Sequence, residues 1–103
     1  MRANNIYIAM YRALDCLYDE HPNNELGEFL SEANPYMFKD RHAADPAIQK
    51  DFDEFVYEDM ESVEAYECVK RYLTNKTSFC DIFSDITLEE WVELCDIVDK
   101  EET

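Results

Sequence analysis

The stretch "MRANNIYIAMYRALDCLYDE" (residues 1–20) predicts an amphipathic helix from the spacing of its apolar side chains. Steps of three and four residues place one set of side chains on a single side: Tyr7, Met10, Tyr11, Leu14, Leu17 and Tyr18. Ile8 and Cys16 fall outside this stripe. Pro22 has no amide hydrogen to continue the helix, so we expect the helix to stop before it.

The same stretch predicts neither a signal peptide nor a transmembrane span, because Tyr7, Arg12 and Asp15 interrupt its apolar residues. The four cysteines are widely separated and include no Cys-x-x-Cys pair: Cys16, Cys68, Cys80 and Cys95. That spacing favours free thiols over a zinc site or a disulfide framework. We therefore expect a cytoplasmic protein that makes no membrane contact.

Composition predicts one helical domain. The chain has 103 residues, 47% of them hydrophobic, which is enough for a single core with a radius of gyration near ~13 Å. Gly27 is its one glycine, and no Asn-Gly or Asp-Gly pair supplies a tight hairpin turn. The expected fold is all-α, a compact single-domain bundle of five or six short helices over residues 1–103.

Two further helix starts follow from capping residues. Asn23 or Asn24 can cap a short helix that ends before Asn34-Pro35. Its predicted buried side is Leu26, Phe29, Leu30 and Ala33. Gly27 within it favours close approach of another helix. Asp45 followed by Pro46 is typical of an N-cap and a first helical position.

The region from residue 46 to 74 fits either one helix or two. Its apolar positions are Ile48, Phe52, Phe55 and Val56, then Val63, Tyr66, Val69 and Leu73. These steps of four and three suit one continuous helix. The stripe turns polar at Asp59 and Ser62, both capping residue types, so we favour a break near 59–62.

The end of the chain carries the clearest local signal. A short helix is expected around Phe79, Ile82 and Phe83. In "DITLEEW" (residues 85–91), Thr87 and Glu90 form a capping box, with Ile86 and Trp91 as the hydrophobic staple. The predicted core side of this last helix is Leu88, Trp91, Cys95 and Val98. Residues 98–103 are expected to be a frayed acidic tail.

Residues 34–44 are predicted to be irregular and bear the cations Lys39 and Arg41 beside His42. We interpret this segment as a joint that bridges two acidic regions by ion pairs. Three of its side chains are expected to pack onto the bundle: Tyr36, Met37 and Phe38. The alternative is that this loop adds specificity to a contact with a partner.

Charge excludes several functional classes. With 25 Asp and Glu against 9 Lys and Arg, the net charge of -16 disfavours direct binding of nucleic acid or anionic lipid. A single glycine excludes phosphate-binding loops, and no calcium-loop or Glu-x-x-His pattern occurs. His21 and His42 are the only histidines available as catalytic bases. We therefore expect neither an enzyme nor a cofactor or metal site.

Two acidic runs carry the leading functional hypothesis. Residues 51–67 hold no Lys or Arg, and residues 81–102 hold only Lys100. As one helix, residues 51–67 would span roughly 25 Å with one negative charge per ~3.2 Å, close to the ~3.4 Å of one DNA strand. The candidate partner-binding residues are Asp53, Glu54, Tyr57, Glu58, Glu61, Glu64, Glu67, Glu89, Glu93 and Asp96.

These residues suggest an acidic binding module or inhibitor that docks on a basic site of a partner protein. In its strongest form it is a nucleic-acid mimic directed at a nucleic-acid-processing enzyme, as antirestriction proteins are. One alternative is an adaptor or homodimer that binds through Ile8, Tyr57, Tyr72 and Leu94, its acidity serving solubility only. Another is an enzyme using His42, Arg41 and nearby carboxylates, which requires a preformed pocket around them.

Overall fold

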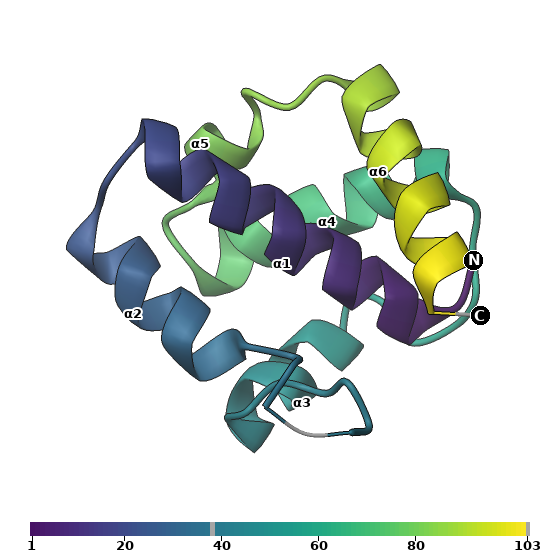
Figure 1. Ribbon diagram of the computed structural model, residues 1–103, viewed down its shortest axis with the longest axis horizontal. Helices are drawn as coiled ribbons and strands as arrows, with labels where there is room; N and C mark the ends of the chain where they lie inside the picture. The colour runs from purple at the N-terminus through teal and green to yellow at the C-terminus, as the bar shows by residue number, and fades with distance from the viewer. Residues whose placement is uncertain (38, 103) are drawn as a thin grey trace.

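Six helices make up the regular structure of the residues described by the computed structural model, 1–37 and 39–102 (Figure 1). Their bounds are α1 Ala3–Glu20, α2 Asn24–Ala33, α3 Pro46–Asp53, α4 Ser62–Lys76, α5 Cys80–Phe83 and α6 Leu88–Glu101. The radius of gyration is 12.3 Å, and these ranges contain no strand. The all-α, compact single-domain prediction is confirmed. Within the same ranges, no helix is long and apolar enough to cross a membrane.

Helix α1 lies at the centre, in contact with α2, α4, α5 and α6 (Figure 1). Five consecutive residues, 6–10, are each 0% exposed, so this part of the helix is covered on every side. The predicted stripe is correct for Tyr7, Met10 and Leu14, which are buried. Ile8, outside the stripe, is buried equally well because neighbours cover that side too.

An aromatic cluster joins α4, α5 and the start of α6. The rings of Tyr66, Phe83 and Trp91 lie with centroids 5.6–6.1 Å apart. The Trp91 indole donates to the Ser62 carbonyl at 2.8 Å, and the Tyr66 hydroxyl donates to the Ile86 carbonyl. The indole N–H of Trp91 and the hydroxyl of Tyr66 therefore both have hydrogen-bond partners within the core.

The predicted caps are present. Asn23 accepts from the amides of Glu25 and Leu26, at 2.8 and 3.2 Å. Asp45 accepts from the Ala47 amide at 2.9 Å, with Pro46 at the first helical position. Thr87 and Glu90 form the reciprocal capping box of α6.

Gly27 fills the predicted role of permitting a close approach, here between α2 and α1. A Cβ at position 27 would lie 3.1 Å from the hydroxyl oxygen of Tyr18, tighter than ordinary van der Waals contact.

The break between α3 and α4 is longer than expected and begins earlier, covering residues 54–61. Phe55 and Val56 lie in this connection, although Val56 is fully buried. Asp59 does act as a cap, but for α1: its carboxylate accepts from the Ala3 amide at 3.3 Å. The Met60 amide donates to the Met1 carbonyl at 3.1 Å. Attachment to the N-terminal residues therefore holds this connection out of a helical path.

Two predicted core positions are wrong. Val63 is 54% exposed and Leu88 is 40% exposed, each in the first turn of its helix. Neighbouring elements cover the following turns instead, where Tyr66 and Trp91 are buried. Apolar periodicity gave the correct side of each helix but not the turn at which packing begins.

The frayed tail is also corrected: α6 remains helical to Glu101, and Val98 is fully buried. Arg12 pairs with Glu101, and the Arg41 Nε lies 3.3 Å from a carboxylate oxygen of Glu102. Arg2 donates to the Glu102 carbonyl at 3.0 Å. Arginines from distant parts of the sequence therefore anchor residues 101 and 102; Thr103 lies outside the described residues.

The irregular segment meets the expectation of a joint only in part: Arg41 pairs with Glu102 at the end of α6, whereas Lys39 has no carboxylate within 4.0 Å among the described residues. The packing predicted for its aromatic end is wrong, because Tyr36 and Met37 are 44% and 63% exposed. Phe38 lies outside the described residues. Tyr36 still contacts the bundle at its edge, with its ring centroid 6.4 Å from that of Tyr11.

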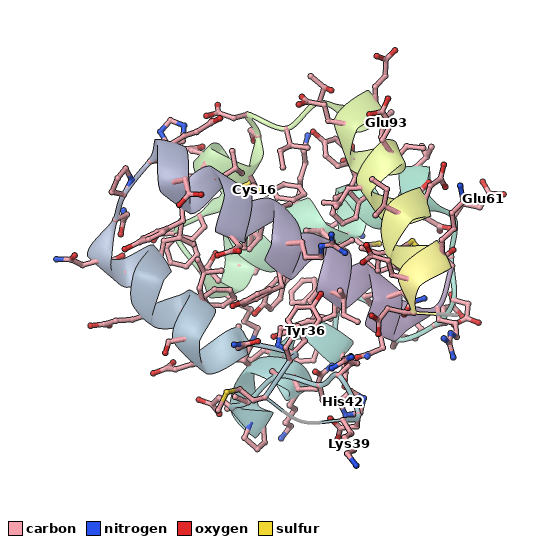
Figure 2. The ribbon with its side chains drawn as sticks, in the orientation of Figure 1. Cys16, Tyr36, Lys39, His42, Glu61 and Glu93 are labelled. Carbon is pink, nitrogen blue, oxygen red and sulfur yellow. The ribbon has the colours of Figure 1, made fainter. Side chains whose placement is uncertain are left out.

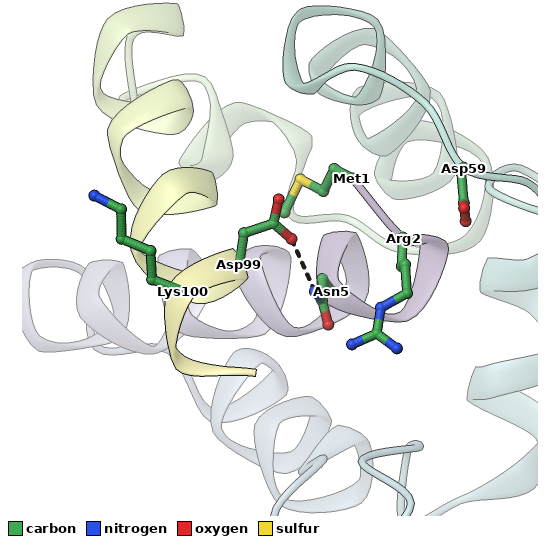
Figure 3. Close-up of a pocket in the computed structure, with 6 residues that line it drawn as sticks. All are labelled: Met1, Arg2, Asn5, Asp59, Asp99 and Lys100. Carbon is green, nitrogen blue, oxygen red and sulfur yellow. Dashed lines mark hydrogen bonds between the residues drawn. The ribbon is translucent and has the colours of Figure 1, made fainter. Parts of the chain in front are cut away.

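A buried polar contact closes the two ends of the chain on each other. Asn5 is the buried polar residue of the described core, and its amide donates to Asp99 at 2.8 Å (Figure 3). Both residues line a cavity of about 550 Å³ that Arg2 and Asp59 also border. Helix α1 is thereby joined to α6 by hydrogen bonding as well as by apolar contact.

Alkaline pH should destabilise the fold through Tyr7 and Tyr72. Burial raises the pKa of both hydroxyls above the ordinary 10.0, with further contributions from Tyr72 near Tyr7 and from Asp51 near Tyr72. The unfolded chain ionises first, so the stabilisation is complete below about pH 10 and is lost as pH rises above it. Urea denaturation should show the free energy of unfolding falling above about pH 10.

The control for this prediction is Tyr57→Phe, at a side chain that is 74% exposed. Tyr7→Phe should weaken the alkaline decline, at a cost of about 1 kcal/mol at neutral pH for the lost hydrogen bond to the Ala33 carbonyl. Equal alkaline declines in wild type and Tyr7→Phe would contradict the assignment.

Candidate partner-binding surface on helices α4 and α6

All ten predicted partner-binding residues are exposed, but they do not form one continuous helix. Asp53 ends α3, Glu54, Tyr57 and Glu58 lie in the connection, and α4 begins at Ser62. The predicted match to the linear charge density of a DNA strand requires an unbroken helix over residues 51–67. Residues 54–61 are not helical, so this match does not support the site.

The α3 end of the predicted site is engaged within the chain. Lys76 lies 3.5 Å from the Glu54 carboxylate and 3.8 Å from that of Asp51. Asp53 accepts a hydrogen bond from the Gln49 side chain at 3.0 Å. Asp53 and Glu54 therefore already have local partners and are separate from the remaining acidic candidates.

The packing of α4 against α6 brings two of the other candidates together, Glu61 and Asp96, whereas Tyr57 and Glu58 stay in the connection before α4. The two helices run in opposite directions where they touch, since Ser62 contacts Trp91 while Tyr66, farther along α4, contacts Ile86. As a result, Glu61 and Asp96 line one pocket of about 290 Å³. In Figure 2, Glu61 and Glu93 lie away from the end of the molecule that bears Lys39 and His42.

One carboxylate from the start of α4 and one from α6 therefore share this pocket, and other exposed carboxylates follow each of them along its helix. Steps of three and four residues carry one row of carboxylates along α4 and a second row along α6. We call the six residues the α4–α6 acidic surface: Glu61, Glu64, Glu67, Glu89, Glu93 and Asp96.

The carboxylates of this surface lack cationic partners. Among the described residues, no Lys, Arg or His nitrogen lies within 4.0 Å of any of the six. Lys70 on α4 is directed to an aromatic ring instead, with its ammonium 4.2 Å from the Tyr66 ring centroid. Repulsion along the two rows is therefore compensated by solvent and counterions rather than by the protein.

Two exposed apolar side chains lie next to these acids in the sequence. Val63 lies between Glu61 and Glu64 and is 54% exposed, and Ile97 follows Asp96 and is 48% exposed. The surface can therefore combine charge with modest apolar contact.

Cys95, which lines this pocket, is buried, and its thiol is disfavoured from ionising. Burial, followed by the charges of Asp99 and Asp96, raises the pKa of the Cys95 thiol to about 12. At neutral pH it is a neutral, buried side chain, in agreement with its predicted core role. Within the ranges 1–37 and 39–102, no cluster of His, Cys, Asp and Glu has the geometry of a metal site.

The apolar patch expected for an adaptor or homodimer is wrong. Ile8 and Tyr72 are buried, the first against the helices around α1 and the second beneath the rings of Phe52 and Phe55. Leu94 is half-buried, which leaves Tyr57 as the exposed member of the predicted set.

The preformed space required by the enzyme hypothesis does exist. Two cavities of about 490 Å³ each share Asp40 and His42. The His42 Nδ1 lies 3.5 Å from the Asp40 carboxylate. The described residues around the two cavities include no Ser, Thr or Cys, so they offer no hydroxyl or thiol of these residue types for His42 to activate.

Comparisons with known proteins give no match to a family model, to a curated protein or to a solved structure.

The cysteine environments predict unequal reactivity. Cys16 is exposed, whereas Cys95 is buried and its thiolate fraction at pH 8 is roughly a thousandfold below that of a thiol with the ordinary pKa of 9.0. With Ellman's reagent we expect one fast phase, removed by Cys16→Ser and unchanged by Cys95→Ser. A fast phase that disappears in Cys95→Ser would contradict this assignment.

The uncompensated carboxylates of the α4–α6 acidic surface should make the melting temperature depend on salt concentration. Glu93→Gln relieves repulsion with Glu89 and Asp96, which lie one turn away, and should raise the melting temperature by about 1–2 °C at 20 mM NaCl. That gain should vanish at 500 mM NaCl. Glu54→Gln is the matched control: Glu54 is paired with Lys76, so its loss should not stabilise. Equal effects of the two substitutions would disprove this explanation.

Proposed function

We propose that this protein is a small binding module or inhibitor whose α4–α6 acidic surface docks on a basic surface of a partner protein. The observation that carries the proposal is that Glu61 and Asp96 meet at one pocket while the surrounding carboxylates have no cationic partner among the described residues. A basic partner would supply the missing counterions and remove the repulsion.

Nucleic-acid-processing enzymes are the partner class that fits best. Their binding sites concentrate Lys and Arg along a groove, because neutralising phosphates dominates their affinity. An exposed, uncompensated carboxylate surface can occupy such a groove and exclude the nucleic acid. This choice of partner class is supported by the uncompensated charge of two packed helices and by the net charge of -16, not by a single extended helix.

The competing explanation is that acidity only keeps the protein soluble. Solubility depends on total charge, whereas docking depends on which carboxylates remain. Two variants with the same charge change can therefore separate the two explanations.

The surface variant carries Glu61→Gln, Glu64→Gln, Glu93→Gln and Asp96→Asn. The matched control carries four neutralisations at exposed positions of α1 and α2: Asp15→Asn, Asp19→Asn, Glu28→Gln and Glu32→Gln. Both have a formal net charge of -12, four less negative than the wild-type -16. Wild type and both variants are immobilised and exposed to lysate of the source cells at 50 and 500 mM salt. Captured proteins are identified by mass spectrometry.

We expect wild type and control to retain a basic nucleic-acid-processing protein at 50 mM salt and to lose it at 500 mM. The surface variant should bind the purified partner at least tenfold more weakly than the control does. Duplex DNA should compete with the wild type for that partner. Equal weakening in both variants, or a complex insensitive to salt and DNA, would refute the proposal.

A further inference from the structure

The irregular segment forms part of a hydrophilic cavity that shares no lining residue with the pocket of the α4–α6 acidic surface. This cavity, of about 490 Å³, lies between the start of α1, residues 39–42 and the end of α6. Figure 2 shows Lys39 and His42 together at the end of the molecule opposite Glu93. All described lining residues are charged or polar. A volume in this range suits a small-molecule ligand, and the lining favours a hydrophilic one.

Basic side chains are concentrated around this cavity. Its lining includes Arg2, Lys39, Arg41 and His42, in a chain that has 9 Lys and Arg and 2 His residues in total. Such a grouping is unexpected for a protein with 25 acidic residues. It makes this cavity a place where an anion meets local cations despite the overall negative charge, because screening limits the reach of distant carboxylates to about 8 Å at physiological salt.

One of these cations, Arg41, already has interaction partners within the protein. Arg41 has a left-handed backbone conformation (φ 61°), and its carbonyl accepts from the Asn4 amide at 3.0 Å. Its guanidinium contacts the Glu102 carboxylate at 3.3 Å and lies 5.2 Å from the centroid of the Tyr36 ring. These contacts hold the loop against α1 and α6. Arg41 therefore positions the wall of the cavity rather than remaining available to a ligand.

Arg2 and Lys39 remain available. Among the described residues, neither has a carboxylate within 4.0 Å, and Arg2 uses one nitrogen for the Glu102 carbonyl. The three carboxylates of the lining are engaged: Glu101 with Arg12, Glu102 with Arg41, and Asp40 with the backbone amide of His42 at 3.0 Å. Free cationic donors therefore share the cavity with carboxylates whose remaining lone pairs can accept hydrogen bonds from hydroxyls.

We propose that this cavity binds a phosphate monoester of a polyhydroxylated compound such as a sugar. The phosphate contacts Arg2 and Lys39, whose N–H groups form charge-assisted hydrogen bonds with its oxygens. Hydroxyl groups donate to Asp40 and Glu102, which would repel an anion without such donors. The described lining residues include no aromatic or aliphatic side chain that would favour a lipid chain or a stacked base.

The test uses the complete protein and ribose 5-phosphate as the probe, followed by amide chemical shifts in nuclear magnetic resonance at constant ionic strength. Saturable shifts are expected at residues 2–5 and 39–42. Ribose alone and inorganic phosphate should bind more weakly, since each offers one half of the recognised chemistry. Arg2→Ala and Lys39→Ala should each weaken binding by roughly tenfold, the usual effect of losing one hydrogen bond to a charged group.

Arg71→Ala is the matched control, because Arg71 is exposed on α4 and lies outside the cavity lining. It should leave affinity unchanged, and the spectrum of each variant without probe reports whether it folds. Shifts reproduced by sodium chloride, or affinity lost equally in Arg71→Ala and Lys39→Ala, would overturn the proposal. Binding by phosphate as strong as by ribose 5-phosphate would overturn the role of the carboxylates.

Discussion

Complete burial of residues 6–10 in α1 is the constraint on which the rest of the structure depends. A helix covered on every side needs neighbours around its whole circumference, and α2, α4, α5 and α6 supply them. Packing around this axis sets where the other elements lie. It pairs α4 with α6 and draws the connection after α3 back to Met1 and Ala3. The acidic surface and the polar cavity both result from that arrangement.

The distribution of the few cations explains how so acidic a chain stays folded while leaving charge uncompensated. Arg12 and Arg41 hold the last turn of α6, and Lys76 bridges α4 to the end of α3. The Arg12 guanidinium is partly buried, which lowers its pKa, but the hydrogen bond and charge of Glu101 more than offset this and raise it. These cations thus stabilise joints between elements, and within residues 1–37 and 39–102 none forms an ion pair with the α4–α6 acidic surface.

The sequence predicted which residues belong to the candidate site but not how those residues are arranged in space. Exposure of the nine acidic candidates follows from their chemistry, because a carboxylate is rarely buried without a partner, whereas the exposure of Tyr57 does not. Their division into separate groups does not follow. The engagement of Glu54 by Lys76 and the meeting of Glu61 with Asp96 join residues 22 and 35 positions apart. No local pattern encodes such distances.

What the sequence by itself determined was where most helices start and stop. Asn23, Asp45 and Thr87 act through hydrogen bonds within three residues, so their effect is readable from neighbouring letters. Only the tertiary structure decided which sides are covered and which ends are held. Ile8 is buried because four helices surround it, Asp59 caps a helix 56 residues away, and Glu102 is ordered by an arginine 61 residues distant. Burial and ion pairing depend on contacts that exist only once the chain has packed.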